Sequence, residues 1–184
     1  MREEVSGFLA MKFLKGGRET YNRCQPRRTL GAPDLYSMKT VNKSVLIWYS
    51  PQEMYALVTD VAAYPKFLPW CDQARVIAED AQGVTAEIGI AFGGIHQKFT
   101  TRNEHQMGQG VRMELVHGPF SHLQGQWNFL PVGAGDQRAC KVELSLNYGF
   151  SNMLLAKLIG PVFDKIAGSL VDAFVKRAEQ VYGA

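Results

Sequence analysis

Four histidines are the residues of this sequence that most readily invite a metal-binding or acid–base role: His96, His105, His117 and His122. Their spacing does not match HExxH, in which two histidines on one helical turn bind zinc. His96 and His122 instead alternate with apolar residues, on the outer face of predicted strands. We therefore interpret them as solvated side chains and predict no metal site and no catalytic histidine.

Glycine-containing turns are a second chemical candidate, because glycine-rich loops can cradle phosphate groups. Each turn lies between two predicted strands, whereas a phosphate cradle lies between a strand and a helix. We interpret Gly93-Gly94, Gly108-Gln109-Gly110 and Gly133-Ala134-Gly135 as hairpin turns. The sequence also has no GxSxG motif and no recognisable Cys/His pairing. It therefore gives little support for catalysis.

A stiff apolar segment is more informative, and it reads Tyr64-Pro65-Lys66-Phe67-Leu68-Pro69-Trp70-Cys71. Two prolines restrain its aromatic residues, so they lose little entropy when they contact a ligand. Its companion is Gly118-Pro119-Phe120, followed at two-residue spacing by Leu123, Gly125, Trp127 and Phe129. These segments form either the rim of a binding cavity or a core plug that closes one end of a sheet.

The element that must position these residues is a long helix over Ser151–Tyr182, with Ser151 or Asn152 as its cap. Proline at Gly160-Pro161 removes a hydrogen bond, so we expect a kink there and a gripping helix from Pro161 onward. The apolar side of this helix is wide enough to cover a sheet. It comprises Leu155, Ile159, Val162, Phe163, Ile166, Leu170 and Phe174.

The preceding segments predict a strand, two short helices and a meander of about six strands. Ser50-Pro51-Gln52-Glu53 has the pattern of a capping box at the start of the first helix. This order predicts an α+β fold, in which a curved antiparallel sheet of about seven strands surrounds the long helix and leaves a cavity. The predicted strands and helices cover 41–48, 51–59, 60–64, 73–79, 84–92, 95–105, 111–117 and 139–150. A sixth strand with Leu123, Trp127 and Phe129 on one face precedes a predicted loop over 131–137.

Composition favours one domain, because the chain has 184 residues and 46% of them are hydrophobic. There is no signal peptide, no apolar run long enough for a membrane span, and no disulfide framework in three scattered cysteines, so we expect a cytoplasmic protein. Residues 1–37 hold seven Lys/Arg and four Asp/Glu, whereas 38–184 hold thirteen of each. A neutral domain argues against a DNA partner.

Residues 1–37 are expected to be a disordered or non-native leader, with Met38 as a candidate start of translation. Their breaker-rich composition offers no apolar face, so the folded domain is predicted to cover 38–184. The alternative is a short basic arm that contacts an anionic partner.

Two stretches, DVAAYPKFLPWC (60–71) and HGPFSHLQGQWNF (117–129), together with the long terminal helix resemble a known family. The resemblance is to the coenzyme-Q-binding branch of the START-type, polyketide-cyclase-like superfamily, and it covers about 38–183. It implies the helix-grip fold of the birch-pollen allergen and a non-catalytic protein that needs no cofactor. It further implies ubiquinone binding in support of respiration, with peripheral contact at the inner membrane.

The same resemblance implies an alternative, because bacterial members of the branch are described as ribosome-association toxins that bind the large ribosomal subunit. A polyketide cyclase or dehydrase is a second alternative, but it needs an acid or base in the cavity. Only Tyr64, Arg112 or Glu114 could supply one, and alternation places the last two outward. For ribosome binding, the visible basic patch is Lys98, Arg102 and Arg112.

The main hypothesis from the sequence is that ubiquinone or another lipid fills the cavity, with its long tail in a dry tunnel. The expected ligand-binding residues are the large apolar side chains of the rim, strands and helix: Tyr64, Phe67, Leu68, Trp70, Phe92, Phe120, Leu123, Trp127, Phe129, Leu144, Phe163, Ile166, Leu170 and Phe174.

Overall fold

The structure, a computed structural model, describes residues 38–133 and 138–183. The predicted leader over 1–37 lies outside the described residues, as does part of the predicted turn at Gly133-Ala134-Gly135. Both therefore stay predictions.

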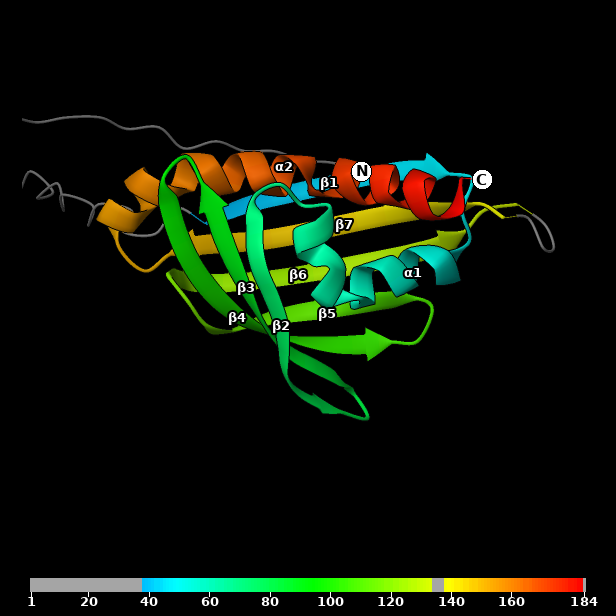
Figure 1. Cartoon of the computed structure of the whole chain (residues 1–184), viewed down its shortest axis with the longest axis horizontal. Coiled ribbons are helices and arrows are strands. Elements are labelled where there is room, and N and C mark those ends of the chain that lie inside the picture. The colour runs from blue at the N-terminus through cyan, green and yellow to red at the C-terminus, as the bar shows by residue number, and fades with distance from the viewer. Residues whose placement is uncertain (1–37, 134–137, 184) are drawn as a thin grey trace, which may run out of the picture. The chain divides into compact units, whose positions relative to one another are not determined.

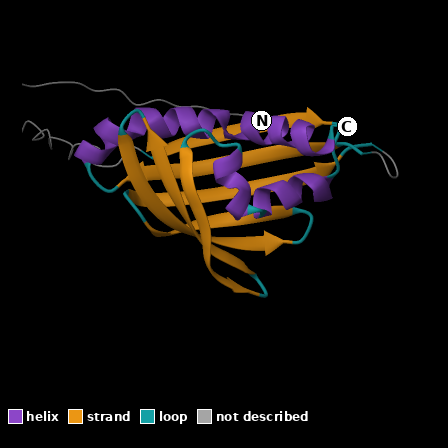
Figure 2. Cartoon of the chain, viewed as in Figure 1, coloured by secondary structure: helices purple, strands orange, loops and turns teal. Residues whose placement is uncertain are grey.

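One seven-stranded antiparallel sheet in the order β1-β7-β6-β5-β4-β3-β2 forms the framework. It curves strongly, and the helices lie on one side of it (Figures 1 and 2). The predicted α+β helix-grip architecture is confirmed. The elements are β1 (Lys39–Ile47), α1 (Pro51–Thr59), the 3-10 helix η1 (Val61–Lys66), β2 (Cys71–Asp80), β3 (Gly83–Phe92), β4 (Ile95–Gln106), β5 (Gly110–His117), β6 (Phe120–Pro131), β7 (Cys140–Phe150) and α2 (Met153–Tyr182).

The core lies between α2 and the inner face of the sheet. Antiparallel pairing sets Trp127 of β6 opposite Leu144 of β7, and Leu123 opposite Tyr148. A slip of one residue would turn all of these side chains to solvent, so their burial confirms the predicted register. The predicted facing set is buried throughout except for the half-buried Leu170: Leu123, Trp127, Phe129, Leu144 and Leu146 from the strands, and Phe163, Ile166 and Phe174 from the helix.

Helix α2 is continuous from Met153, so the gripping helix does not begin at Pro161 as predicted. Asn152 caps it, because its side chain accepts a hydrogen bond of 2.9 Å from the Leu155 amide. Pro161 has no N–H, so only the carbonyl of Lys157, four residues earlier, lacks its helical hydrogen bond. Lys157 is exposed, and water can satisfy this carbonyl. Gly160 is already buried and lies close to the ring of Phe150.

The predicted capping box is present at the start of α1. The Ser50 hydroxyl accepts a 3.2 Å hydrogen bond from the Glu53 amide, and the Glu53 carboxylate accepts a 2.7 Å hydrogen bond from the Ser50 amide. The guanidinium of Arg138 donates to both Glu53 oxygens and to the carbonyl of Tyr182. One cation thus joins α1, the segment before β7 and the end of α2.

Replacing Glu53 by Gln is predicted to destabilise the fold in a pH-dependent way. Hydrogen bonds from Arg138, and then from Ser50, lower the pKa of Glu53 from 4.5 to about 2. Its charge therefore stabilises the folded state above pH 4.5, and this contribution is lost as the pH falls towards 2. At pH 7 we expect Glu53→Gln to lower the free energy of unfolding by about 1 kcal/mol, a figure that allows for the half-exposed Arg138.

Urea unfolding of the variant and of the unaltered protein, from about pH 2.5 to about pH 7, measures the difference in their free energies of unfolding. The matched control is Glu104→Gln, since Glu104 is exposed and has no ion-pair partner among the described residues. A Glu53 difference that did not shrink in acid would contradict the prediction.

Candidate functional site

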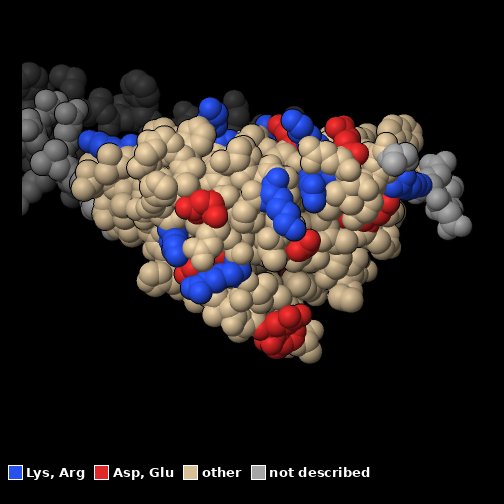
Figure 3. All heavy atoms as spheres, viewed as in Figure 1, with Lys and Arg blue, Asp and Glu red and all other residues tan. Residues whose placement is uncertain are grey.

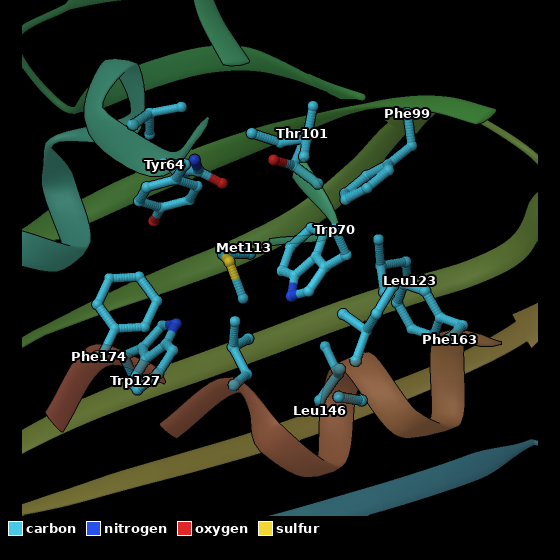
Figure 4. A pocket seen from close by; sticks show the side chains of 16 residues that line it. Tyr64, Trp70, Phe99, Thr101, Met113, Leu123, Trp127, Leu146, Phe163 and Phe174 are labelled. Carbon is cyan, nitrogen blue, oxygen red and sulfur yellow. The ribbon is translucent and has the colours of Figure 1, made fainter. Parts of the chain in front are cut away.

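A cavity of about 80 Å³ lies between α2 and the inner face of the sheet, and the side chains of 16 residues line it (Figure 4). Its walls are apolar except at Tyr64, Thr101 and Asn103 and at the indole nitrogens of Trp70 and Trp127. Of the expected ligand-binding residues, those that line the cavity are Tyr64, Trp70, Leu123, Trp127, Phe163, Ile166, Leu170 and Phe174.

Other expected residues lie behind these walls and support them. Phe120 packs on Phe163 with ring centroids 4.8 Å apart, and Phe129 stacks on Trp127 at 6.3 Å. Phe67 meets the ring of Phe174 edge-on at 5.2 Å. Leu68 and Leu144 are buried in the core without reaching the cavity.

Phe92 is not part of the cavity, contrary to the expectation from alternation. It is the last residue of β3, immediately before the Gly93-Gly94 turn, and 37% of its surface is exposed. The ammonium of Lys165 lies 5.2 Å from the centre of its ring. Alternation fixes the face of the sheet, but it does not show where the helix ceases to cover that face.

Two polar wall residues were missed, Thr101 and Asn103 of β4. Both are buried, and Asn103 is only 7% exposed. The two-residue turn at Gly93-Gly94 sets the register of β3 and β4. In this register Ile88 is paired with Phe99, and Val84 is paired with Asn103. Since Val84 was predicted to face inward, this hairpin register could have placed Thr101 and Asn103 inside.

Asn103 is electrostatically the most unusual group of the cavity. Its Oδ1 has no hydrogen-bond partner among the described residues. A buried amide oxygen without a partner destabilises a fold by about 1–3 kcal/mol. The cavity therefore presents one unsatisfied acceptor within apolar walls.

Tyr64 is the one titratable side chain among the described residues that line the cavity. Its hydroxyl donates a 2.6 Å hydrogen bond to the Val58 carbonyl, and burial raises its pKa. Arg112 and Glu114, which were predicted to face outward, pair with each other on the outer face of β5. The arrangement is suited to binding an apolar molecule, because no acid or base in it changes charge near neutral pH.

The predicted basic patch lies on the outer face of β4 and β5, but its charges are compensated. Arg102 lies 2.6 Å from Asp80 and Arg112 lies 2.6 Å from Glu114, while Lys98 lies 3.6 Å from Glu87, a carboxylate that it shares with Arg75 at 3.0 Å. Figure 3 likewise shows basic and acidic side chains interspersed on the face in view. Such pairs leave little net field for an anionic partner.

A different basic site, which we call the η1–α2 groove, is hollowed between these two helices and measures about 520 Å³. Lys66, Lys176 and Arg177 line it, and none of them has a carboxylate within 4.0 Å among the described residues. Asp172 is the one acidic side chain of its lining. Trp70 lines both the groove and the cavity.

Arg177 is held over the floor of the groove. Its guanidinium carbon lies 5.5 Å from the centre of the Phe67 ring, while its buried Nε has no hydrogen-bond partner among the described residues. Sequence reasoning missed this groove, because Lys66 and the helix residues are about 110 positions apart and only the fold brings them together.

A curved antiparallel sheet that closes on a long helix, with an apolar cavity between them, defines a helix-grip protein of the START type. The sequence profile described as "Polyketide cyclase / dehydrase and lipid transport" matches residues 47–175. The chain belongs to this family.

Known relatives carry two kinds of name. The "Ribosome association toxin RatA" of Vibrio cholerae is 40% identical over 79% of this chain and 99% of its own. The mitochondrial "Coenzyme Q-binding protein COQ10 homolog B" of Xenopus laevis is 30% identical over 84% of this chain and 64% of its own. A START superfamily protein from Mycobacterium smegmatis, 19% identical, shares the fold with a TM-score of 0.63 over 77% of this chain and 98% of its own.

None of the helices in the described part of the chain combines the length and apolar character that crossing a membrane requires. Within the same residues, no three His, Cys, Asp or Glu side chains gather where they could hold a metal ion. Burial raises the pKa of the Cys71 and Cys140 thiols to about 11, which makes both poor nucleophiles at neutral pH.

Gly125→Ala, which adds a methyl group at the cavity wall, is predicted to weaken ligand binding without unfolding the protein. A methyl group on Gly125 would lie 2.2 Å from Cε of Met113 and 3.3 Å from Cδ1 of Leu146, and both side chains line the cavity. The end of Met113 is flexible, so we expect Gly125→Ala to change the free energy of unfolding by no more than about 1–2 kcal/mol. Binding of toluene, followed by calorimetry, should fall at least about fivefold.

Gly168→Ala is the matched control, because nothing lies within 4 Å of the added methyl group on α2. This variant should bind toluene like the unaltered protein, and its helix should be slightly more stable. Equal binding by both variants would show that the ligand does not occupy this cavity.

Proposed function

We propose that this protein associates with the ribosome and that the η1–α2 groove makes the contact. The single observation that carries the proposal is the gathering of Lys66, Lys176 and Arg177, without carboxylate partners among the described residues, in one groove. The relatives named ribosome association toxin support it, at 40% identity over nearly their whole length.

The chemistry of the groove suits ribosomal RNA. Unpaired cations release counterions from a phosphate backbone, which drives association. Phe67 and Trp70 in the same lining offer aromatic faces on which an unpaired base can stack. The resemblance seen in the sequence implies the large ribosomal subunit as the partner. The proposal therefore keeps the ribosome but moves the contact from the predicted strand patch to the helices.

Reversing the groove charges is predicted to remove ribosome binding. We expect Lys66→Glu/Lys176→Glu to lose co-sedimentation with isolated large subunits, because both side chains are exposed and neither has a carboxylate partner within the described part of the chain. The matched control is Lys98→Glu/Arg102→Glu, which makes the same change of charge where each cation already has a carboxylate. The control should bind nearly as well as the unaltered protein, and loss of binding in it alone would return the contact to the strand patch.

Asp172→Asn is predicted to act in the opposite direction, because it removes the one carboxylate from the groove lining. Binding to large subunits should tighten by about two- to fivefold at low salt. For the double lysine variant, the slope of log K against log salt should fall by about 1.5, the value for two lost phosphate contacts. Unchanged slopes would mean that the groove does not contact phosphate groups.

A second candidate function is favoured by the apolar cavity, namely binding of a small apolar ligand or of the head group of a lipid such as ubiquinone. The relative named as a coenzyme Q-binding protein supports it. The cavity of about 80 Å³ is, however, smaller than the roughly 150 Å³ that holds a benzene molecule in a protein core. A long isoprenoid tail would therefore have to lie outside this cavity or separate α2 from the sheet.

Binding is a better proposal than catalysis. A cyclase or dehydrase must move protons, and the proton of Tyr64 is donated to the Val58 carbonyl. Burial raises the pKa of this hydroxyl further, which opposes its use as a base. Two relatives that cover most of this chain are likewise named for association and binding.

A further inference from the structure

We propose that the cavity recognises a small aromatic ring bearing a hydroxyl group, a phenol or the quinol form of a quinone, and that Asn103 binds the hydroxyl. The inference rests on the second candidate function, ligand binding in the cavity, and it is independent of ribosome association. It begins from Asn103, a residue of the cavity lining that is only 7% exposed and whose buried Oδ1 has no hydrogen-bond partner among the described residues.

The unsatisfied amide specifies the polar end of the ligand. Oδ1 accepts a hydrogen bond, so an O–H donor fits it and a ketone oxygen does not. A hydroxyl both donates and accepts, and it can therefore satisfy the amide whichever way the group is turned. A quinol therefore fits either orientation of the amide, whereas the corresponding quinone fits only where Nδ2 is turned towards it.

The rest of the wall specifies the body of the ligand. Figure 4 shows rings from opposite sides of the cavity directed into it, among them Trp70 from the turn before β2, Trp127 from β6 and Phe163 from α2. A flat ring packs against such faces and edges without fixing many rotatable bonds. At about 80 Å³ the cavity is smaller than the roughly 150 Å³ cavity that holds benzene, so a single ring is the largest body that fits once the walls move, and a sterol is far too large.

A ring enters after small movements of side chains. Met113 and Leu170 line the cavity and are only half-buried, so both can move outward without opening the core. Methionine is the most adaptable apolar side chain for such a position. Asn103 is paired with Met113 across β4 and β5, which places the polar anchor beside the movable wall.

The test compares 4-methylphenol with 4-fluorotoluene, two rings of nearly the same size of which only the first donates a hydrogen bond. Calorimetry on the full chain should show 4-methylphenol binding roughly three- to tenfold more tightly. In Asn103→Leu, which keeps the approximate shape of the side chain, this preference should disappear. In Thr101→Val, the matched control two residues away on the same strand, it should persist.

Thermal unfolding distinguishes ligand binding by Asn103 from a purely structural role, because the two roles predict changes of Tm in opposite directions. Because Asn103→Leu removes an unsatisfied buried amide, it should raise Tm by about 2–8 °C while abolishing the preference. A lower Tm would mean that the amide has a structural partner, and it would overturn the proposal.

The remaining outcomes separate this inference from the function on which it rests. Equal binding of the two rings by the unaltered protein would refute the role of Asn103 and leave cavity binding intact. Loss of the preference in Thr101→Val alone would assign the anchor to Thr101 instead and overturn the assignment to Asn103. Binding of neither ring would refute both the inference and the proposal that the cavity takes a small ligand.

Discussion

The contact between the apolar side of α2 and the inner face of the sheet is the interaction on which the rest of the structure depends. Phe163 packs against Phe120 and Tyr148, and Phe174 packs against Trp127, Tyr64 and Phe67. Each such ring contributes about 1.5–3 kcal/mol by leaving water, so this contact dominates the stability of the domain. In Figure 1 the sheet curves around the apolar side of this helix, whose buried residues extend from Ile159 to Ala178.

The parts of the molecule set by local pattern were predictable from the sequence. Two-residue alternation gave the inner faces of β3, β6 and β7, and Gly93-Gly94 gave a hairpin with both glycines at positive φ. Ser50 and Glu53 gave the start of α1. The long helix over 151–182 was predicted, but the start of the gripping helix before Pro161, at the buried Ile159 and Gly160, was not, because it depends on the close approach of Gly160 to Phe150.

The candidate sites were predictable only in part, for a reason that differs between them. The periodicity of large apolar residues predicts which of them face the core. The inward position of Asn103 can be predicted only from the strand register, which pairs it with Val84. Lys66 and Lys176 line the same η1–α2 groove, but they are far apart in the sequence, and no local sequence pattern indicates that the fold brings them together. The ion pairs of the strand patch were hidden from the sequence for the same reason, because the carboxylates that lie near Lys98 and Arg102 come from a neighbouring strand or from across a turn.

The two faces of α2 explain how one fold serves relatives with such different names. Phe174 faces the cavity, and Arg177, three residues later, lines the groove, so the same turn of helix contributes to both candidate sites. Substitutions at solvent-facing positions such as Lys176 change the field of the groove while the packing of the core stays as it is. Side chains that face the core are constrained by their volume. An exchange such as Asn103→Leu nevertheless keeps nearly the same shape and changes the hydrogen-bonding capacity of the cavity. The proposed ribosome contact and the proposed ligand site share Trp70 but otherwise use different side chains, so a substitution elsewhere can alter one site without the other.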